Sequence, residues 1–167
     1  MYKIRYIGDP VLRKPAQPIT LFDEKLRSFI KEMTEIMYTE DGIGLAAPQI
    51  GFSKSLTIVD VSELDDTIPS GAQVFINPQI IESSGQSVVE EGCLSIPGVN
   101  EEVTRPDTIK MTYQNENGEE FTKTYTGWMA RVLQHEIDHL NGILFVDHIS
   151  PLKRNLLINQ GAIPEIY

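Results

Sequence analysis

Residues 133–142 read LQHEIDHLNG and contain two of the three histidines of this 167-residue chain, His135 and His139. Residues four apart lie on one face of a helix, so these side chains can present two imidazole nitrogens to one metal ion. Glu136 follows the first histidine and can reach a water on that metal without being a ligand itself. Metal-assisted hydrolases need this arrangement, with ligands on a rigid element and a carboxylate base beside the activated water.

The residues around this stretch favour a helix. An apolar stripe near helical spacing is formed by Trp128, Val132, Ile137 and Leu140, and Asn141-Gly142 is a stop signal. A short HExxH pattern also arises by accident, so an amphipathic helix with two histidines in register is the competing interpretation. Support for a metal site must come from elsewhere in the chain.

Composition and charge limit the class of protein. A length of 167 residues predicts one domain, residues 1–167, and 41% apolar with 23% charged residues is ordinary for a globular protein. A net charge of -10 argues against DNA as a partner. The single cysteine, Cys93, cannot form an intrachain disulfide and favours a reducing compartment. Without a targeting segment or a membrane-length apolar run, the protein is expected to be cytoplasmic, with no membrane contact.

Hydrophobic periodicity predicts an α+β fold, in which short antiparallel β-sheets pack around the central metal-binding helix. One long N-terminal helix is expected over residues 21–40, and a short C-terminal helix from Ser150-Pro151 to about residue 159. Asn117-Gly118 predicts a hairpin turn between the last two strands. The expected strands are residues 4–7, 55–60, 73–82, 87–90, 101–105, 108–115 and 119–126.

A glycine-rich segment, GIGLAAPQIG, occupies residues 42–51, where Pro48 prevents a regular helix. Because its residues are small, another segment of the chain or a ligand could come close to the backbone amides and carbonyls. The segment matches neither the Walker pattern nor the dinucleotide fingerprint, so it does not predict a phosphate site. A tight packed turn and a functional loop are both consistent with it.

A catalytic metal needs a third protein ligand, with one position left for water. The metzincin spacing would place Phe145 there, and phenylalanine cannot ligate. A thermolysin-like site would need a downstream glutamate, for which Glu165 is close to the C-terminus. His148 is more typical of a structural or surface histidine. Cys93 could be a strong thiolate ligand for Zn²⁺ or Fe²⁺, although a lone cysteine is more often a small buried apolar residue.

Three segments in the order GIGLAAPQ, EGCLS and QHEIDHLNG resemble the motifs of the peptide deformylases. Their spacing also matches, and the similarity extends from about Tyr2 to Lys153. The resemblance implies a metal-dependent amidohydrolase, acting on linear amides, that removes the N-formyl group from the N-terminal methionine of newly synthesised polypeptides and releases formate. It further implies one divalent metal ion per chain, Fe²⁺ in the cell, which Zn²⁺, Ni²⁺ or Co²⁺ can replace.

The resemblance also assigns chemical roles to individual residues. It implies three metal ligands, Cys93, His135 and His139, with Glu136 as the group that moves the proton. The oxygen of the formyl group would accept hydrogen bonds from the side-chain amide of Gln49 and the backbone N–H of Leu94.

Substrate contacts follow from the same resemblance. The peptide would bind as an added strand on the backbone of Ile43, Gly44 and Gly92. The methionine side chain would lie in a pocket around His135 that is lined by Ile43, Val89, Trp128, Arg131 and Val132. Glu91 would orient this region and pair with Arg105, and Asp138 is either a further supporting residue or a solvated helix residue.

The implied partners are nascent N-formyl-methionine peptides, and the chain is expected to be a monomer. Some family members carry an arginine where Asn100 stands here, so the contacts to outer peptide residues are left open. Others end in a long basic helix implicated in transient ribosome association. Here the tail is short and interrupted by Gly161 and Pro164, with Lys153-Arg154 as its basic pair.

Two other functions are compatible with part of the pattern. An HExxH zinc endopeptidase would use Glu165 as a ligand and would have no role for Cys93. A non-catalytic binder of acylated N-termini would use the same pocket. The presence of Glu136 and Gln49 argues against the second alternative, because a binder needs no general base.

Overall fold

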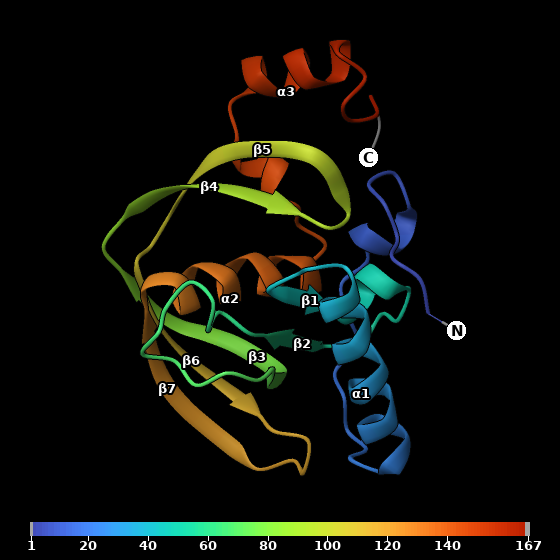
Figure 1. Cartoon of the computed structure of the whole chain (residues 1–167), viewed down its shortest axis with the longest axis vertical. Coiled ribbons are helices and arrows are strands. Elements are labelled where there is room, and N and C mark those ends of the chain that lie inside the picture. The colour runs from blue at the N-terminus through green and yellow to red at the C-terminus, as the bar shows by residue number, and fades with distance from the viewer. Residues whose placement is uncertain (1, 166–167) are drawn as a thin grey trace.

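The computed structural model describes residues 2–165 and has the α+β fold predicted from the sequence (Figure 1). Within that range the α-helices are α1 (Glu24–Thr39), α2 (Gly127–Leu140) and α3 (Pro151–Asn159), and short 3₁₀ helices are η1 (Pro10–Arg13), η2 (Ala47–Ile50) and η3 (Phe145–His148). The strands are β1 (Gly44–Ala46), β2 (Leu56–Val59), β3 (Gln73–Ser84), β4 (Ser87–Cys93), β5 (Ile96–Arg105), β6 (Thr108–Gln114) and β7 (Glu120–Thr126).

Two antiparallel sheets lie on either side of α2. One has five strands in the order β1-β2-β3-β6-β7, and the other consists of β4 and β5. Figure 1 shows α2 across the middle of the molecule, with β4 and β5 on one side and the larger sheet on the other. The central helix expected from the sequence is therefore confirmed as the centre of the fold.

The burial of α2 explains why it is a rigid support. On one side, Met129, Leu133 and Ile137 belong to the same apolar cluster as Phe75 and Met111 of the larger sheet. On the other side, the ring of His135 stacks on Phe145, with ring centroids 6.0 Å apart. A helix that is packed on opposite faces cannot shift without opening a core, so its side chains are held in place.

The N-terminal helix begins later than predicted because Asp23 caps it. The Asp23 side chain accepts a hydrogen bond from the backbone N–H of Leu26, which satisfies one of the free amides at the start of α1. Leu26, Phe29, Met33 and Met37 then repeat at helical spacing and are buried in the core beside the larger sheet. None of the helices within residues 2–165 is long and apolar enough to cross a membrane.

One local prediction was wrong, and one segment whose structure was left open contains regular structure. Residues 4–7 do not form a strand, because Arg5 donates to the carbonyl of Gln49 and Ile7 to that of Ser95, so the segment links two loops. The glycine-rich segment is not wholly a turn, because Gly44–Ala46 forms β1 at the edge of the larger sheet and Ala47–Ile50 forms η2. A three-residue strand has too little periodicity to be recognised in the sequence.

Candidate metal and catalytic site

The structure brings Cys93, His135 and His139 together. Their ligand atoms all lie within 4.8 Å of one another, and the Sγ of Cys93 is 3.4 Å from the Nε2 of His139. The two histidines come from successive turns of α2, and Cys93 comes from the end of β4, where the register with β5 shifts after Glu91. This cluster contains neither Glu165 nor His148, the other two candidate ligands.

The donor set fits a divalent transition metal. His135 contacts the Oε1 of Glu91 through its Nδ1, at 2.8 Å, which leaves its Nε2 for ligation. Burial lowers the pKa of His139 well below its ordinary value, while hydrogen bonds to Cys93 and Glu91 outweigh burial and raise the pKa of His135 well above it. An imidazole ligand must be neutral, so binding of a cation would release the proton from His135. One thiolate with two imidazoles suits Fe²⁺ or Zn²⁺ and leaves a position for water or substrate.

Glu91 connects the site to the smaller sheet and to α2. Arg105 donates two hydrogen bonds to its carboxylate, at 2.6 and 2.9 Å, and Arg131 donates one at 2.6 Å. Burial by itself would raise the pKa of Glu91, but the hydrogen bonds from Arg105 and His135 outweigh it and hold the pKa well below its ordinary value. An ionised carboxylate therefore orients His135, and Arg105 also bonds Asp138 at 2.9 Å.

Glu136 is buried beside the cluster. Its Oε1 has no hydrogen-bond partner within residues 2–165, and burial raises the pKa of this carboxyl to about 7, with His135 opposing the shift and Glu91 adding to it. The backbone of β1 passes so close that a Cβ on Gly44 would overlap its Oε2. A carboxyl with a pKa near neutrality can both accept and return a proton.

Gln49 is held with its amide group directed at the same cluster. Its Oε1 accepts a hydrogen bond from the backbone N–H of Ala46, at 2.9 Å, while its Nε2 lies 3.5 Å from the Sγ of Cys93 and 3.1 Å from the Oγ of Ser95. The N-terminal segment supports both loops, because Arg5 and Ile7 bond to the carbonyls of Gln49 and Ser95. Sequence analysis did not identify Ser95 as a contributor.

A cavity of about 410 Å³ opens onto these groups. Most of the predicted substrate-binding residues line it, namely Ile43, Gly44, Glu91, Gly92, Trp128, Arg131 and Val132, and so does Leu94, the expected backbone donor to the formyl oxygen. Val89 is not among the lining residues. Arg105 does not line the cavity either, and it contacts the site through its hydrogen bond to Glu91. Asp41 and Glu90 also line the cavity, and both were missed because exposed acidic residues carry no distinctive sequence pattern.

Arg131 lines the cavity as expected, and its charged group is bonded to neighbouring residues. Its guanidinium donates to Glu91, to the carbonyl of Val103 and to Ser87. The side chain is buried, with only 5% of its surface exposed, so its charge is used to hold β4 and β5 against α2. It lines the pocket without offering a free positive charge to a ligand.

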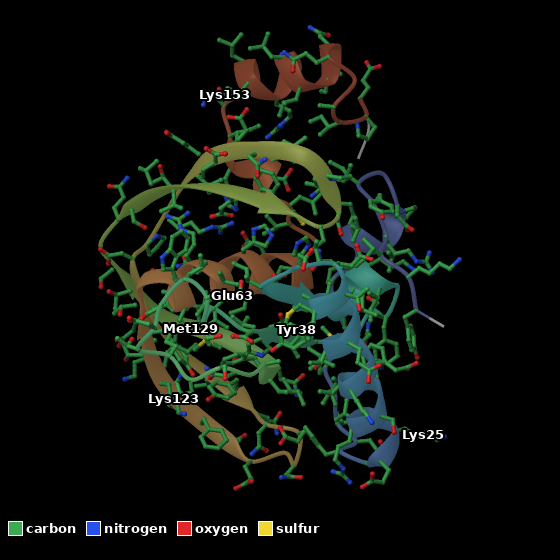
Figure 2. All side chains as sticks on the ribbon, in the orientation of Figure 1. Lys25, Tyr38, Glu63, Lys123, Met129 and Lys153 are labelled. Carbon is green, nitrogen blue, oxygen red and sulfur yellow. The ribbon has the colours of Figure 1, made fainter. Side chains whose placement is uncertain are left out.

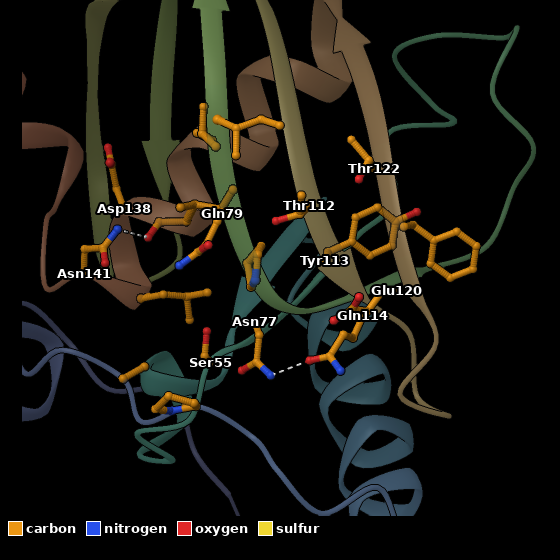
Figure 3. A pocket seen from close by; sticks show the side chains of 18 residues that line it. Ser55, Asn77, Gln79, Thr112, Tyr113, Gln114, Glu120, Thr122, Asp138 and Asn141 are labelled. Carbon is orange, nitrogen blue, oxygen red and sulfur yellow. Dashed lines mark hydrogen bonds between the residues drawn. The ribbon is translucent and has the colours of Figure 1, made fainter.

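A larger cavity, of about 1040 Å³, lies elsewhere on the molecule (Figure 3). It is lined by β3, β6 and β7 and by the C-terminal end of α2, and Figure 3 shows amide and hydroxyl side chains there, including Gln79, Thr112 and Asn141, beside apolar ones. Asn77 and Gln114 bond to each other across part of it, at 2.7 Å. Size alone therefore does not mark the site in this protein.

Comparison with known proteins gives one consistent family. The sequence model for polypeptide deformylase matches residues 1–155. The chain is 50% identical to the peptide deformylase of Thermotoga maritima over 158 residues, which covers 94% of this chain and 92% of that protein. It is 51% identical to the peptide deformylase of Desulfotalea psychrophila over 154 residues, covering 92% of this chain and 90% of the relative.

A solved structure shows the same fold. The crystal structure of a peptide deformylase from Synechococcus elongatus in complex with actinonin superimposes with a TM-score of 0.90 at 42% identity, covering 98% of this chain and 89% of that one. The match covers nearly the whole chain, so the likeness includes the fold as well as the sequence motifs.

Proposed function

This chain belongs to the polypeptide deformylase family, and from that premise we propose how its residues carry out the reaction. Deformylation of nascent peptides is the activity of the family, and the chain is a metal-dependent hydrolase of this kind. The observation that supports the assignment of residues is the convergence of Cys93, His135 and His139 beside the buried carboxyl of Glu136.

Cys93, His135 and His139 would hold one divalent metal ion, Fe²⁺ in the cell, with Zn²⁺, Ni²⁺ or Co²⁺ as substitutes. When bound, the ion would polarise the formyl oxygen and lower the pKa of water in the site. Glu91 keeps the ring of His135 in the orientation needed for ligation, because it accepts the proton on Nδ1.

Glu136 moves the proton in both halves of the reaction. Its carboxylate takes a proton from water as the water oxygen bonds to the formyl carbon. It then gives that proton to the amide nitrogen as the carbon–nitrogen bond breaks, which yields formate and a free amine. A pKa of about 7, raised by burial, suits a group that must accept and return one proton near neutral pH.

Negative charge develops on the formyl oxygen before the bond breaks. The Nε2 of Gln49 and the backbone N–H of Leu94 are the proposed donors to this oxygen. Gln49 is suited to the task because its Oε1 is already bonded to Ala46, which fixes the direction of the amide N–H groups.

The peptide is proposed to bind as a strand between β1 and β4. Each of these strands has one strand partner in its sheet, β2 and β5 respectively, and residues next to both line the cavity. The carbonyl of Ile43 already accepts from Asp60, at 2.8 Å, so strand alternation directs the backbone groups of Gly44 away from β2. Gly92 falls where β4 leaves register with β5, and the methionine side chain would lie against Trp128 and Val132.

We further propose that the chain works in the cytoplasm as a monomer and as one catalytic domain, with transient access to the ribosome. The single cysteine and the negative net charge of -10 are consistent with a reducing compartment and argue against strong binding to RNA.

The decisive experiment is formate release from a formyl-methionine peptide, without oxygen and with Fe²⁺ or Ni²⁺ supplied. Oxygen is excluded because an Fe²⁺–thiolate centre oxidises readily. Turnover should be lost in Glu136→Gln while bound metal persists, and undiminished turnover in this variant would overturn the assigned mechanism.

A matched pair of variants separates this function from a zinc endopeptidase. Cys93→Ala should lose the metal, and Glu165→Ala should keep both metal and activity, because Glu165 lies outside the cluster. The opposite outcome would support the endopeptidase. Turnover by the parent protein itself excludes a non-catalytic binder.

A further inference from the structure

One carboxylate joins several segments of the chain next to the first strand of the larger sheet. Asp60 follows β2, and its Oδ1 accepts hydrogen bonds from the backbone N–H of Ser62, at 3.0 Å, and from the Ser62 hydroxyl, at 2.7 Å. Its Oδ2 accepts a hydrogen bond from the hydroxyl of Tyr38 and another from the backbone N–H of Gly71, at 3.3 Å. The side chain of Asp60 therefore ties the last turn of α1 to both ends of the loop over residues 61–71.

Tyr38 holds this carboxylate from the C-terminal end of α1. Figure 2 shows Tyr38 and Glu63, which belongs to the loop after Asp60, on neighbouring parts of the molecule. Burial by itself would raise the pKa of Asp60, but hydrogen bonds from Ser62 and Tyr38 outweigh it and hold that pKa below its ordinary value. The bond to Asp60 also raises the pKa of Tyr38 to about 12. A neutral phenol thus donates to an ionised carboxylate, and such a charge-assisted hydrogen bond is stronger than a neutral one.

The backbone of Asp60 controls the peptide unit that joins Ile43 to Gly44 at the start of β1. The backbone N–H of Asp60 donates to the carbonyl of Ile43, at 2.8 Å. A trans peptide unit is planar, so its carbonyl and its N–H point in opposite directions. Because the carbonyl of Ile43 is fixed on the side of β2, the N–H of Gly44 must point to the other side, where Gly44 lines the cavity.

The rest of β1 is held by contacts that do not involve Asp60. Leu45 is paired with β2, and its carbonyl also accepts a hydrogen bond from the Oγ1 of Thr57, at 2.8 Å. These contacts keep the Cα of Gly44 in its place against Glu136. If the bond from Asp60 were weakened, the first peptide unit could rotate about the line between its two Cα atoms. The N–H of Gly44 would then turn while its Cα stayed beside Glu136.

We propose that Asp60, held by Tyr38, is a positioning residue that directs the N–H of Gly44 at the backbone of the substrate peptide. The inference rests on the proposed function, in which the peptide binds along the edge of β1. Asp60 and Tyr38 are not among the residues that line the cavity, so they act through this peptide unit and do not touch the substrate. The candidate metal ligands lie on α2 and β4, and metal binding should not depend on the pair.

Steady-state kinetics of the metal-loaded enzyme with formyl-Met-Ala-Ser test this role. Tyr38→Phe removes only the hydroxyl and should raise KM about threefold, because one hydrogen bond is lost. Asp60→Ala removes every side-chain acceptor and should raise KM about tenfold, while Asp60→Asn keeps one oxygen and should lie between the parent and Asp60→Ala. In all three variants kcat should stay within about twofold of the parent, since lost binding that is common to ground and transition states appears in KM.

Amide hydrogen exchange, followed by NMR on the zinc-loaded protein, reports on the peptide unit without turnover. The N–H of Asp60 is protected by its bond to the carbonyl of Ile43. Its exchange should become about threefold faster in Tyr38→Phe, while the amides of β6 and β7 should keep the rates of the parent. Faster exchange of all these amides together would instead indicate a general loss of stability.

A matched control removes the same atom elsewhere in the same sheet. Tyr125 lies on β7, at the opposite edge of the sheet from β1, and donates its hydroxyl to that of Tyr113, at 3.3 Å. Tyr125→Phe should change neither KM nor the exchange of the Asp60 amide. Tyr38→Phe combined with Asp60→Ala should raise KM no further than Asp60→Ala alone, because both changes remove the same bond.

Several results would overturn the inference. These are an unchanged KM in Tyr38→Phe and Asp60→Ala, an equal rise of KM in Tyr125→Phe, a loss confined to kcat or to bound metal, or faster exchange in β6 and β7 as well as at Asp60. Formate release by the parent enzyme tests the proposed function separately. Its absence would refute the function and the positioning role together, whereas turnover with an unchanged KM in the variants would refute the positioning role alone.

Discussion

Gly44 and Glu136 are so close that no side chain fits between the backbone of β1 and the carboxylate on α2. A Cβ at position 44 would overlap the Oε2 of Glu136 and would lie 2.9 Å from the Cγ1 of Val132. The glycine is therefore required by the approach of the helix, and the contact fixes the proposed proton carrier relative to the proposed peptide-binding strand.

We expect Gly44→Ala to displace Glu136. A shift of about 1 Å in a catalytic group can cost about 100-fold in rate, so kcat should fall by roughly this factor. Steady-state kinetics and metal analysis of the same sample check this, since the ligands are not touched. An alanine variant with unchanged kcat would show that the carboxylate has room to move.

We expect Glu91→Gln to weaken both the fold and metal binding. The change leaves the buried guanidinium groups of Arg105 and Arg131 without their anion, at a cost of about 3–5 kcal/mol in the free energy of unfolding. It also alters the acceptor for His135, which should lower metal affinity about 10- to 100-fold. Urea unfolding and chelator competition measure the two effects.

A matched control for that prediction lies on the surface of α1. Glu24 and Arg27 form an exposed ion pair, with 87% and 37% of their side-chain surfaces accessible. Glu24→Gln should change the free energy of unfolding by about 0.5 kcal/mol or less, because water screens the pair. An equal loss of unfolding free energy in Glu24→Gln and Glu91→Gln would show that the burial of Glu91 does not determine the cost of removing its charge.

Removal of the metal should lower the melting temperature. A ligand present at about 100 times its dissociation constant stabilises the folded state by about 2.7 kcal/mol, which corresponds to about 5–10 °C for a chain of this size. Differential scanning fluorimetry with and without chelator measures the shift. In Cys93→Ala the chelator should have little effect, and an equal shift there would argue that Cys93 is not a ligand.

The ionisation of Asp147 should make the free energy of unfolding depend on pH in acidic solution. Burial opposes ionisation, but hydrogen bonds from Arg13 and from the backbone N–H of Leu144 outweigh it and hold the pKa of Asp147 below its ordinary value of 3.8. A carboxyl whose pKa is lower in the folded state contributes stability above its unfolded pKa. That stability is lost as pH falls through the folded pKa, below about pH 4.

Asp147→Asn should therefore lower stability by about 1 kcal/mol at neutral pH and flatten the loss of stability below pH 4. Thermal melts from pH 3 to pH 7 compare it with the parent and with Asp66→Asn, a control in the exposed loop before β3. If the variant and the parent lose stability in parallel below pH 4, the pair with Arg13 does not contribute there.

The helix with the HEIDH motif, the α1 helix, most of the strands and the family could all be recognised from the sequence. These features depend on periodicity and on motifs such as HEIDH, which are properties of neighbouring residues and need no knowledge of distant ones. The third metal ligand could not be chosen at that level, because Glu165, His148 and Cys93 were all candidates and only the resemblance to a family favoured Cys93.

The residues by themselves determined that a helix with His135, Glu136 and His139 on it would lie at the centre of an α+β fold. Only the tertiary structure decided that Cys93 reaches those imidazoles, that β1 exists and must have glycine at position 44, and that Arg131 is committed to Glu91. Those features depend on the approach of segments that are far apart in the chain. The packing of α2 between the two sheets brings these segments together, and this packing cannot be predicted from a pattern of neighbouring residues.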